Sequence, residues 1–351
     1  MMRPCGVFNA DYHQDKAILR TPQQWGLLLI SLVFIFAVFP RVVPSEYVSL
    51  VMFMGIFVIA LQGLNIILGY AGQISVGHAA FMAVGAYTSA ILVAKVHLPF
   101  LLSLVLAGVV AALVGMLFGA PSVRIKGFYL ALCTLAAHFI IIYVINNWTS
   151  LTGGPYGMTV PAASVAGIEL KSAESYYYLV MALLVVLTFL AVNISRSKAG
   201  RAFIAIRDND IAAEVMGINI FRYKLLAFGI GTFYAGIAGA LMAHQWGFIN
   251  TDYFQLMHSI WYLGLLVVGG LGSNLGPIFG GVIYHGLGYV IDSYFPLLAE
   301  AIPFGRAEHF ATLGLLVYAL VIILSLVFEP RGLAHRWHIF KASYRLFPFS
   351  Y

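Results

Sequence analysis

The chain has 351 residues, of which 62% are hydrophobic and only 9% are charged. The hydrophobic share exceeds the roughly 45–50% that is typical of soluble domains. Several uncharged runs are long enough to cross a bilayer core of about 30 Å as helices. The composition therefore excludes a soluble globular domain and indicates an integral membrane protein with many spans.

Ten apolar segments are predicted to be membrane-spanning helices, which gives an all-α, polytopic fold. They are residues 24–40, 47–68, 77–94, 98–120, 127–145, 176–194, 223–243, 253–271, 277–298 and 309–328. A cytoplasmic N-terminal segment, residues 1–23, is predicted to precede this transmembrane domain of residues 24–328. A basic cytoplasmic tail, residues 329–351, is predicted to follow it.

The distribution of Lys and Arg predicts the orientation. With the N-terminus in the cytoplasm, 15 of the 19 basic residues fall in inside segments, and one falls in each of four outside loops. Because Lys and Arg of short loops collect on the cytoplasmic side, both termini are predicted to be cytoplasmic. The net charge of +6 then reflects orientation and lipid contact, and nucleic-acid binding is not expected.

Two predicted inside junctions are rich in Gly and polar residues and carry no fixed charge. The first junction is Gly69–His78, "GYAGQISVGH", and the second is Gly269–Pro277, "GGLGSNLGP". Non-helical backbone at membrane depth is tolerated only where it is buried in protein or lines a cavity. The junctions are therefore candidates for a translocation pathway, although close helix packing through small residues is an alternative. The candidate pathway residues are Gly72, Gln73, Ser75, Gly77, His78, Gly272, Asn274 and Gly276.

Motifs of enzymes and metal sites are absent from the sequence. It contains no GxxxxGK[ST] phosphate loop, HExxH motif or CxxC pair, and its ten histidines are scattered. We therefore expect no ATPase site, no metal site and no enzymatic activity. Asp292, His138 and His285 lie in predicted spans, where they are more typical of interfacial or packing residues than of a proton relay. Any energy for transport is expected to come from elsewhere.

The stretch "GRAFIAIRDNDIAAEVMGINIFRYK", Gly200–Lys224, concentrates charge within the predicted cytoplasmic loop 195–222. Residues 207–217 are predicted to form one amphipathic helix of about three turns. Asp208 or Asn209 is expected to cap its start, and Gly217 to end it. Arg207, Asp210 and Glu214 would share one face, and Ile211, Val215 and Ile218 another. A solvated loop is the alternative, but it accounts for neither the acids nor the apolar stripe.

This segment resembles the cytoplasmic coupling segment of ABC-importer permeases, especially the branched-chain amino-acid permeases of the LivM type. Ala212, Ala213, Glu214 and Gly217 correspond to the family's "EAA…G" element in a loosened form. Three further stretches are similar to that family's signatures, and the resemblance covers nearly the whole chain. They are "GYAGQISVGHAAFMAVGAYTSAIL", "LTGGPYGM" and "GGLGSNLGPIFGG".

The resemblance implies a permease of the bacterial inner membrane that imports branched-chain, aliphatic amino acids by alternating access. Its implied partners are a related second permease, two cytoplasmic ATPase subunits that hold Mg-ATP, and a periplasmic amino-acid-binding protein. The chain itself is expected to bind no cofactor. The implied docking residues for the ATPase are Arg207, Asp208, Asp210, Ile211, Ala212, Ala213, Glu214 and Gly217. A permease for urea or short amides and an independent ion-coupled carrier remain alternatives.

Overall fold

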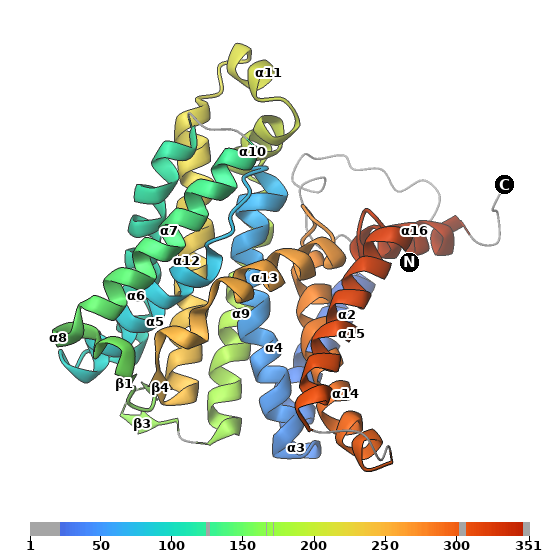
Figure 1. Cartoon of the computed structure of the whole chain (residues 1–351). Helices are drawn as coiled ribbons and strands as arrows, with labels where there is room; N and C mark the ends of the chain where they lie inside the picture. Colours follow the sequence, from blue (N-terminus) through green and yellow to red (C-terminus); the bar gives the residue numbers. More distant parts are fainter. Residues whose placement is uncertain (1–21, 124–126, 166, 171, 302–306, 347–351) are drawn as a thin grey trace.

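The computed structural model describes residues 22–123, 127–165, 167–170, 172–301 and 307–346, and these are almost wholly helical (Figure 1). Each predicted span contains a helix. In chain order these helices are α2 (Pro22–Val33) with η1 (Phe34–Val38) and α3 (Phe39–Val42), α4 (Ser45–Leu64) with η2 (Asn65–Tyr70), α5 (His78–Ala94), α6 (Phe100–Gly119), α7 (Phe128–Asn147), α9 (Ala173–Arg196), α12 (Ile220–Trp246), α13 (Leu256–Gly269), α14 (Gly276–Ala301) and α15 (Ala307–Phe328).

Further elements lie between these helices or follow the last of them. They are η3 (Ala120–Val123), α8 (Thr149–Thr152), η4 (Gly154–Tyr156), α10 (Lys198–Asp208), α11 (Asp210–Val215), η5 (Thr251–Phe254) and α16 (Leu333–Leu346). Two antiparallel pairs of two-residue strands complete the described residues, β1 (Met158–Thr159) with β4 (Phe248–Ile249) and β2 (Ser164–Val165) with β3 (Ile168–Glu169).

Six helical segments of the described residues are long and apolar enough to cross a membrane. The bent pair of α15 and α16 would make a seventh. The chain is therefore a multi-pass membrane protein. The count of ten stays a prediction, because α5 has only 17 residues and α13 only 14, or about 21 Å of helix.

Helix α12 lies at the centre of the bundle and packs against α4, α5 and α6. Small residues allow these contacts: a Cβ atom on Gly63 would overlap the carbonyl oxygen of Gly231, and one on Gly85 would overlap that of Gly236. Since lipid tails are as apolar as the side chains, close van der Waals contact is what holds such helices together.

The segment formed by α10 and α11 lies at one end of this bundle, and α8 and the β1–β4 pair lie at the other (Figure 1). At one end, the Lys95 ammonium donates to the carbonyl oxygens of Ser150 and Leu151, near the β1–β4 pair. At the other end, Arg207 donates to the carbonyl oxygen of Gly69. This grouping agrees with the predicted alternation of inside and outside loops.

The tail that the sequence predicted only as basic contains α16, which is bent by 47° from α15. The start of α16 packs onto the second junction, where a Cβ atom on Gly270 would lie 2.9 Å from the Cβ atom of Ala334. The predicted tail therefore includes a helix that is joined to the body of the protein.

Candidate coupling segment and translocation pathway

The charged segment forms two helices, and the prediction of one continuous helix from Arg207 to Gly217 is wrong. Helix α10 ends at Asp208 and α11 begins at Asp210, because Asn209 between them has extended backbone angles of φ −159° and ψ 106°. Its side-chain Oδ1 accepts a hydrogen bond from the Ala212 amide at 3.0 Å. Asn is a favoured N-cap, and such a cap starts a new helix where the periodicity alone predicts continuation.

The predicted ends of the segment are confirmed. Asn209 caps the start of α11. Gly217 has a φ of +82°, and the amide of the next residue, Ile218, donates to the carbonyl oxygen of Ala213 at 3.0 Å. This left-handed glycine is the usual helix stop. With only six residues, α11 is shorter than the predicted three turns.

The apolar side chains of α11 point outward. Ile211 is 67% exposed, Val215 82% and Met216 81%, whereas Ala213 is buried. We call these three exposed residues the α11 tip. An apolar cluster of this kind beside charged residues is typical of a surface that binds another protein. The tip lies at the far end of the molecule, beyond α10 and α12 (Figure 1).

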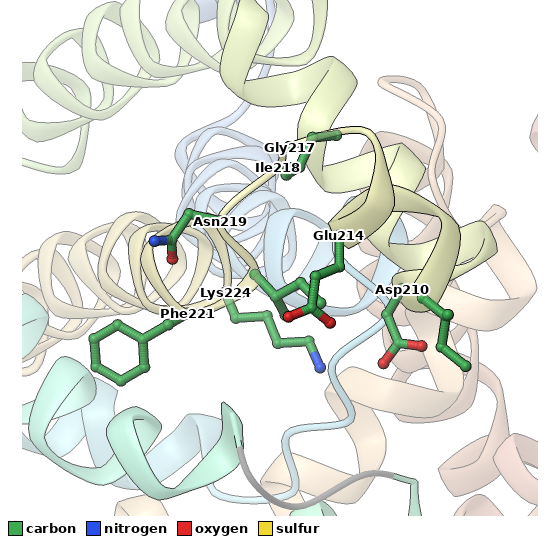
Figure 2. Close-up of a pocket in the computed structure, with 9 residues that line it drawn as sticks. Asp210, Glu214, Gly217, Ile218, Asn219, Phe221 and Lys224 are labelled. Atoms are coloured by element: carbon green, nitrogen blue, oxygen red, sulfur yellow. The ribbon is translucent and has the colours of Figure 1, made fainter.

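A cavity of about 500 Å³ lies between α11 and the start of α12. Figure 2 shows the side chains of Asp210, Glu214 and Lys224 extending to the same side of it. Lys224 is only 8% exposed, and Asn219 caps α12 by accepting from the Arg222 amide at 3.0 Å. Both signs of charge therefore border the hollow beneath the α11 tip.

Arg207 was predicted to share a face with Asp210 and Glu214, but the structure places it on the preceding helix and turns it away from α11. Its Nη1 donates to the carbonyl oxygen of Gly69 at 2.8 Å. Its Nε and Nη2 lie 3.0 Å from the Asp208 carboxylate. Arg207 thus belongs to the contact between the coupling segment and the first junction.

The first junction turns back into the bundle. After the π-helix η2, residues 71–77 leave the helix, and the His78 Nε2 then lies 2.9 Å from the carbonyl oxygen of Ala60. Since Ala60 precedes Tyr70 by ten positions in α4 and η2, the chain has turned back along this helix by His78. Irregular backbone at membrane depth is expected only inside protein or along a cavity.

Three predicted pathway residues of this junction are buried with unsatisfied polar atoms. Gln73 is 1% exposed, and Ser75 and His78 are fully buried. Within the described part of the chain, both amide atoms of Gln73, the Ser75 Oγ and the His78 Nδ1 have no hydrogen-bond partner. Each buried polar atom without a hydrogen bond destabilises the folded state by about 1–3 kcal/mol. Unsatisfied atoms of this kind are compatible with a segment that binds polar ligands or water.

The second junction breaks the helix between α13 and α14, as the sequence predicted. Asn65 holds it: its Nδ2 donates to the Ser273 carbonyl oxygen, and its Oδ1 accepts from the Gly272 amide, both at 2.9 Å. The Tyr70 hydroxyl donates to Asn274 Oδ1 at 2.5 Å. The structure thus brings the two predicted junctions together, through residues of η2.

Asn65 and Tyr70 were missed by the sequence analysis. The sequence does contain a signal for Asn65, because this residue and nearby Gln62 are polar side chains inside an otherwise apolar span. Polar residues within spans are usually functional or pair with other helices. Gln62 donates to the Thr188 hydroxyl at 2.6 Å. These contacts link η2 and α4 to both the second junction and α9.

Two glycines make room for Arg207 between the junctions. A Cβ atom on Gly72 would lie 2.8 Å from the Arg207 Cγ, and one on Gly272 would lie 2.8 Å from its Nη1. Both glycines also have positive φ angles, of +66° and +70°. Predicted residues Gly77 and Gly276 border the same junctions, where Gly276 donates to the Ser273 hydroxyl at 2.8 Å.

The histidines His138 and His285 have different surroundings. His138 is buried, and the His285 ring packs 5.3 Å from Phe57 and 5.1 Å from Tyr284. The side chain of Asp292 lies outside the described ones. Within the described residues, no three His, Cys, Asp or Glu side chains are placed to hold a metal ion.

Residues 47–326 match the family described as the permease component of the branched-chain amino acid transport system. The chain belongs to this family. It is 34% identical to the high-affinity branched-chain amino acid permease proteins LivM of Salmonella typhimurium and of Escherichia coli, over 72% of this chain and 65% of each relative. It is 26% identical to LivH of Salmonella typhimurium, over 61% of this chain and 74% of that protein.

The matched part of the chain covers 65% of the length of each LivM relative. No solved structure matches the chain. The family is one of membrane-spanning transport components, which agrees with the multi-pass fold described above.

Proposed function

We propose that the chain is the transmembrane permease subunit of an ATP-driven importer of branched-chain, aliphatic amino acids. In this proposal partner ATPase subunits supply the energy, and the bundle alternates between states open to either side of the bacterial inner membrane. The family and the names of its LivM and LivH members support the amino-acid substrate.

The observation that carries the proposal is the contact between the coupling segment and both junctions. The α11 tip offers an exposed apolar surface at the end of the bundle, and Arg207, three residues before the start of α11, donates to the first junction. Asn65 and Tyr70 extend this contact to the second junction. A displacement of α11 can therefore be transmitted through these hydrogen bonds to the non-helical backbone of the candidate pathway.

The proposed assembly contains a second permease subunit, two cytoplasmic ATPase subunits that bind Mg-ATP, and a periplasmic amino-acid-binding protein. The α11 tip and the bordering acids are the proposed docking surface for the ATPase. The LivH relative supports a related permease as the second subunit, since LivM and LivH are both named as permeases of one type of transport system.

The test is uptake of labelled leucine by vesicles that contain the complete assembly, with isoleucine, valine and urea as competitors. Glu214→Lys reverses a charge beside the α11 tip, and Gly217→Pro is incompatible with a φ of +82° and removes an amide that donates to the Glu214 carbonyl oxygen. Both variants are expected to insert into the membrane but to lose ATPase binding or coupled uptake. Lys198→Gln, at the exposed start of α10, is the control.

Normal uptake by both variants would exclude the docking role. Uptake that persists in vesicles without any ATPase would instead favour an independent carrier. Uptake of labelled urea by vesicles that take up no labelled leucine would favour an amide permease.

A further inference from the structure

Helix α16 follows the last predicted span but is not part of it. Helix α15 has 22 residues and a length of about 33 Å, so it can cross a bilayer core of about 30 Å without α16. Helix α16 begins five positions after α15 ends and is bent by 47° from it. Figure 1 shows α16 turning outward from α15, on the opposite side of the molecule from α6 and α7. It therefore lies beyond the end of the span.

The charge of this end of the chain is entirely basic. Residues 331–351 contain four Lys or Arg and no Asp or Glu. Arg336 pairs with Glu329, with 2.9 Å between its Nε and the Glu329 Oε2. Arg331 and Lys341 are exposed, and neither forms an ion pair within the described part of the chain. Two cations are therefore available to a negatively charged partner.

An aromatic pair lies on the exposed side of α16. Trp337 and Phe340 are separated by three positions, and their rings stack with centroids 5.8 Å apart. They are 47% and 62% exposed, although both side chains are large and apolar. With roughly 3.6 residues per turn, Arg336 and Lys341 fall on either side of this pair. Aromatic rings between two cations are typical of a helix that lies at a membrane interface.

The start of α16 is fixed on the body of the protein. The Gly332 amide donates to the Glu329 carbonyl oxygen at 2.8 Å, and Gly332 has a φ of +78°. A Cβ atom on Gly332 would overlap the Cα atom of Gly270, which belongs to the second junction. The turn between α15 and α16 is thus packed tightly against the bundle, and the fold sets the position of the aromatic pair relative to the spans.

We infer that α16 is an interfacial helix that binds anionic phospholipid headgroups. Arg331 and Lys341 contact the lipid phosphates, and the rings of Trp337 and Phe340 enter the boundary between headgroups and acyl chains. An exposed apolar pair can also bind a cytoplasmic protein, but the position directly after a span and the absence of acidic residues favour an anionic bilayer. The inference requires the multi-pass fold and not the proposed transport function.

The test is hydrogen exchange of the full chain in nanodiscs of phosphatidylcholine, alone or mixed with phosphatidylglycerol. The amides of residues 333–343 are expected to exchange roughly 25-fold more slowly in the anionic discs, about fivefold for each of the two available cations. High salt is expected to remove this difference, because it screens exposed charges. Lys341→Gln is expected to reduce the difference about fivefold, whereas Lys341→Arg preserves the charge and is expected to retain it.

The matched control is Lys198→Gln, the same substitution at an exposed lysine of α10. It is expected to leave the exchange of α16 unchanged in both kinds of disc. A second variant, Phe340→Ser, tests the insertion of the rings. It is expected to speed the exchange of α16 in neutral and anionic discs alike, because the lost apolar contact with lipid does not depend on headgroup charge.

Equal exchange of wild-type α16 in neutral and anionic discs would overturn the inference. An equal loss of protection in Lys198→Gln would also overturn it, since the effect would then follow total charge rather than α16. Protection that appears only after a cytoplasmic protein is added would assign the aromatic pair to a protein surface instead. None of these outcomes involves transport, so the proposed function is tested separately by the uptake of leucine.

Discussion

Replacing Arg207 by Met is expected to uncouple ATP hydrolysis from transport. Met retains an unbranched side chain that matches the stem of Arg as far as Nε, but it loses the donor to the Gly69 carbonyl oxygen, a bond of 2.8 Å. A hydrogen bond from a charged donor contributes about 1.5–3 kcal/mol. Because the Arg207 side chain is 37% exposed, the lower end of that range applies. About 1.5 kcal/mol corresponds to roughly a tenfold change in the equilibrium between states in which the coupling segment contacts the first junction and states in which it does not.

The assay measures leucine uptake and phosphate release in the same vesicles. Uptake per ATP hydrolysed is expected to fall about tenfold in Arg207→Met, while ATPase binding persists because the α11 tip is unchanged. Arg207→Lys, which retains a charged donor, is expected to recover part of the loss. Asp208→Asn is the control: its carboxylate is 62% exposed, and exposed ion pairs contribute about 0–1 kcal/mol.

Normal coupling in Arg207→Met would refute this reasoning. So would an equal loss in Asp208→Asn, since the ion pair rather than the bond to Gly69 would then be responsible.

Three further predictions concern the bundle, the second junction and the tip. Gly85→Ala is expected to destabilise the chain in a thermal-unfolding assay, because the new Cβ atom overlaps the Gly236 carbonyl oxygen, whereas Gly286→Ala, with no atom within 4 Å of the new Cβ, should be neutral or stabilising. Asn65→Leu removes two hydrogen bonds of 2.9 Å and is expected to weaken the second junction by at least about 2 kcal/mol, seen as faster hydrogen exchange there; unchanged exchange would contradict it. Val215→Asp, at a site that is 82% exposed, is expected to keep the melting temperature but abolish co-purification with the ATPase; retained binding would exclude the tip.

The helices were predictable because uncharged runs of this length have few other stable conformations in a membrane. The two breaks were predictable from clustered Gly and polar residues in the junctions. The number of spans was less predictable than the helices themselves, because α13 has only 14 residues although its apolar run is longer. Hydropathy does not distinguish a crossing helix from a shorter buried one.

The spacing of charged and apolar residues did not predict that the coupling segment is divided into two helices. The charges at Arg207, Asp210 and Glu214 fit one helical face, yet Asn209 adopts an extended conformation between them. The partner of Arg207 is also 138 positions away in the chain, so no local spacing indicates it. Asn65 likewise pairs with backbone more than 200 positions distant, and only its polarity within a span marks it.

Asn209 also separates two tasks along the chain. Residues after it form the surface offered to a partner, and residues before it, through Arg207, contact the interior. Arg207 contacts Gly69 and Gly272, whereas the side chains of the α11 tip are exposed, so substitutions in the tip leave the glycines that accommodate the guanidinium undisturbed. Under the proposed docking role, substitutions in this one turn of helix can adapt the surface to a different partner while the internal contacts stay constant.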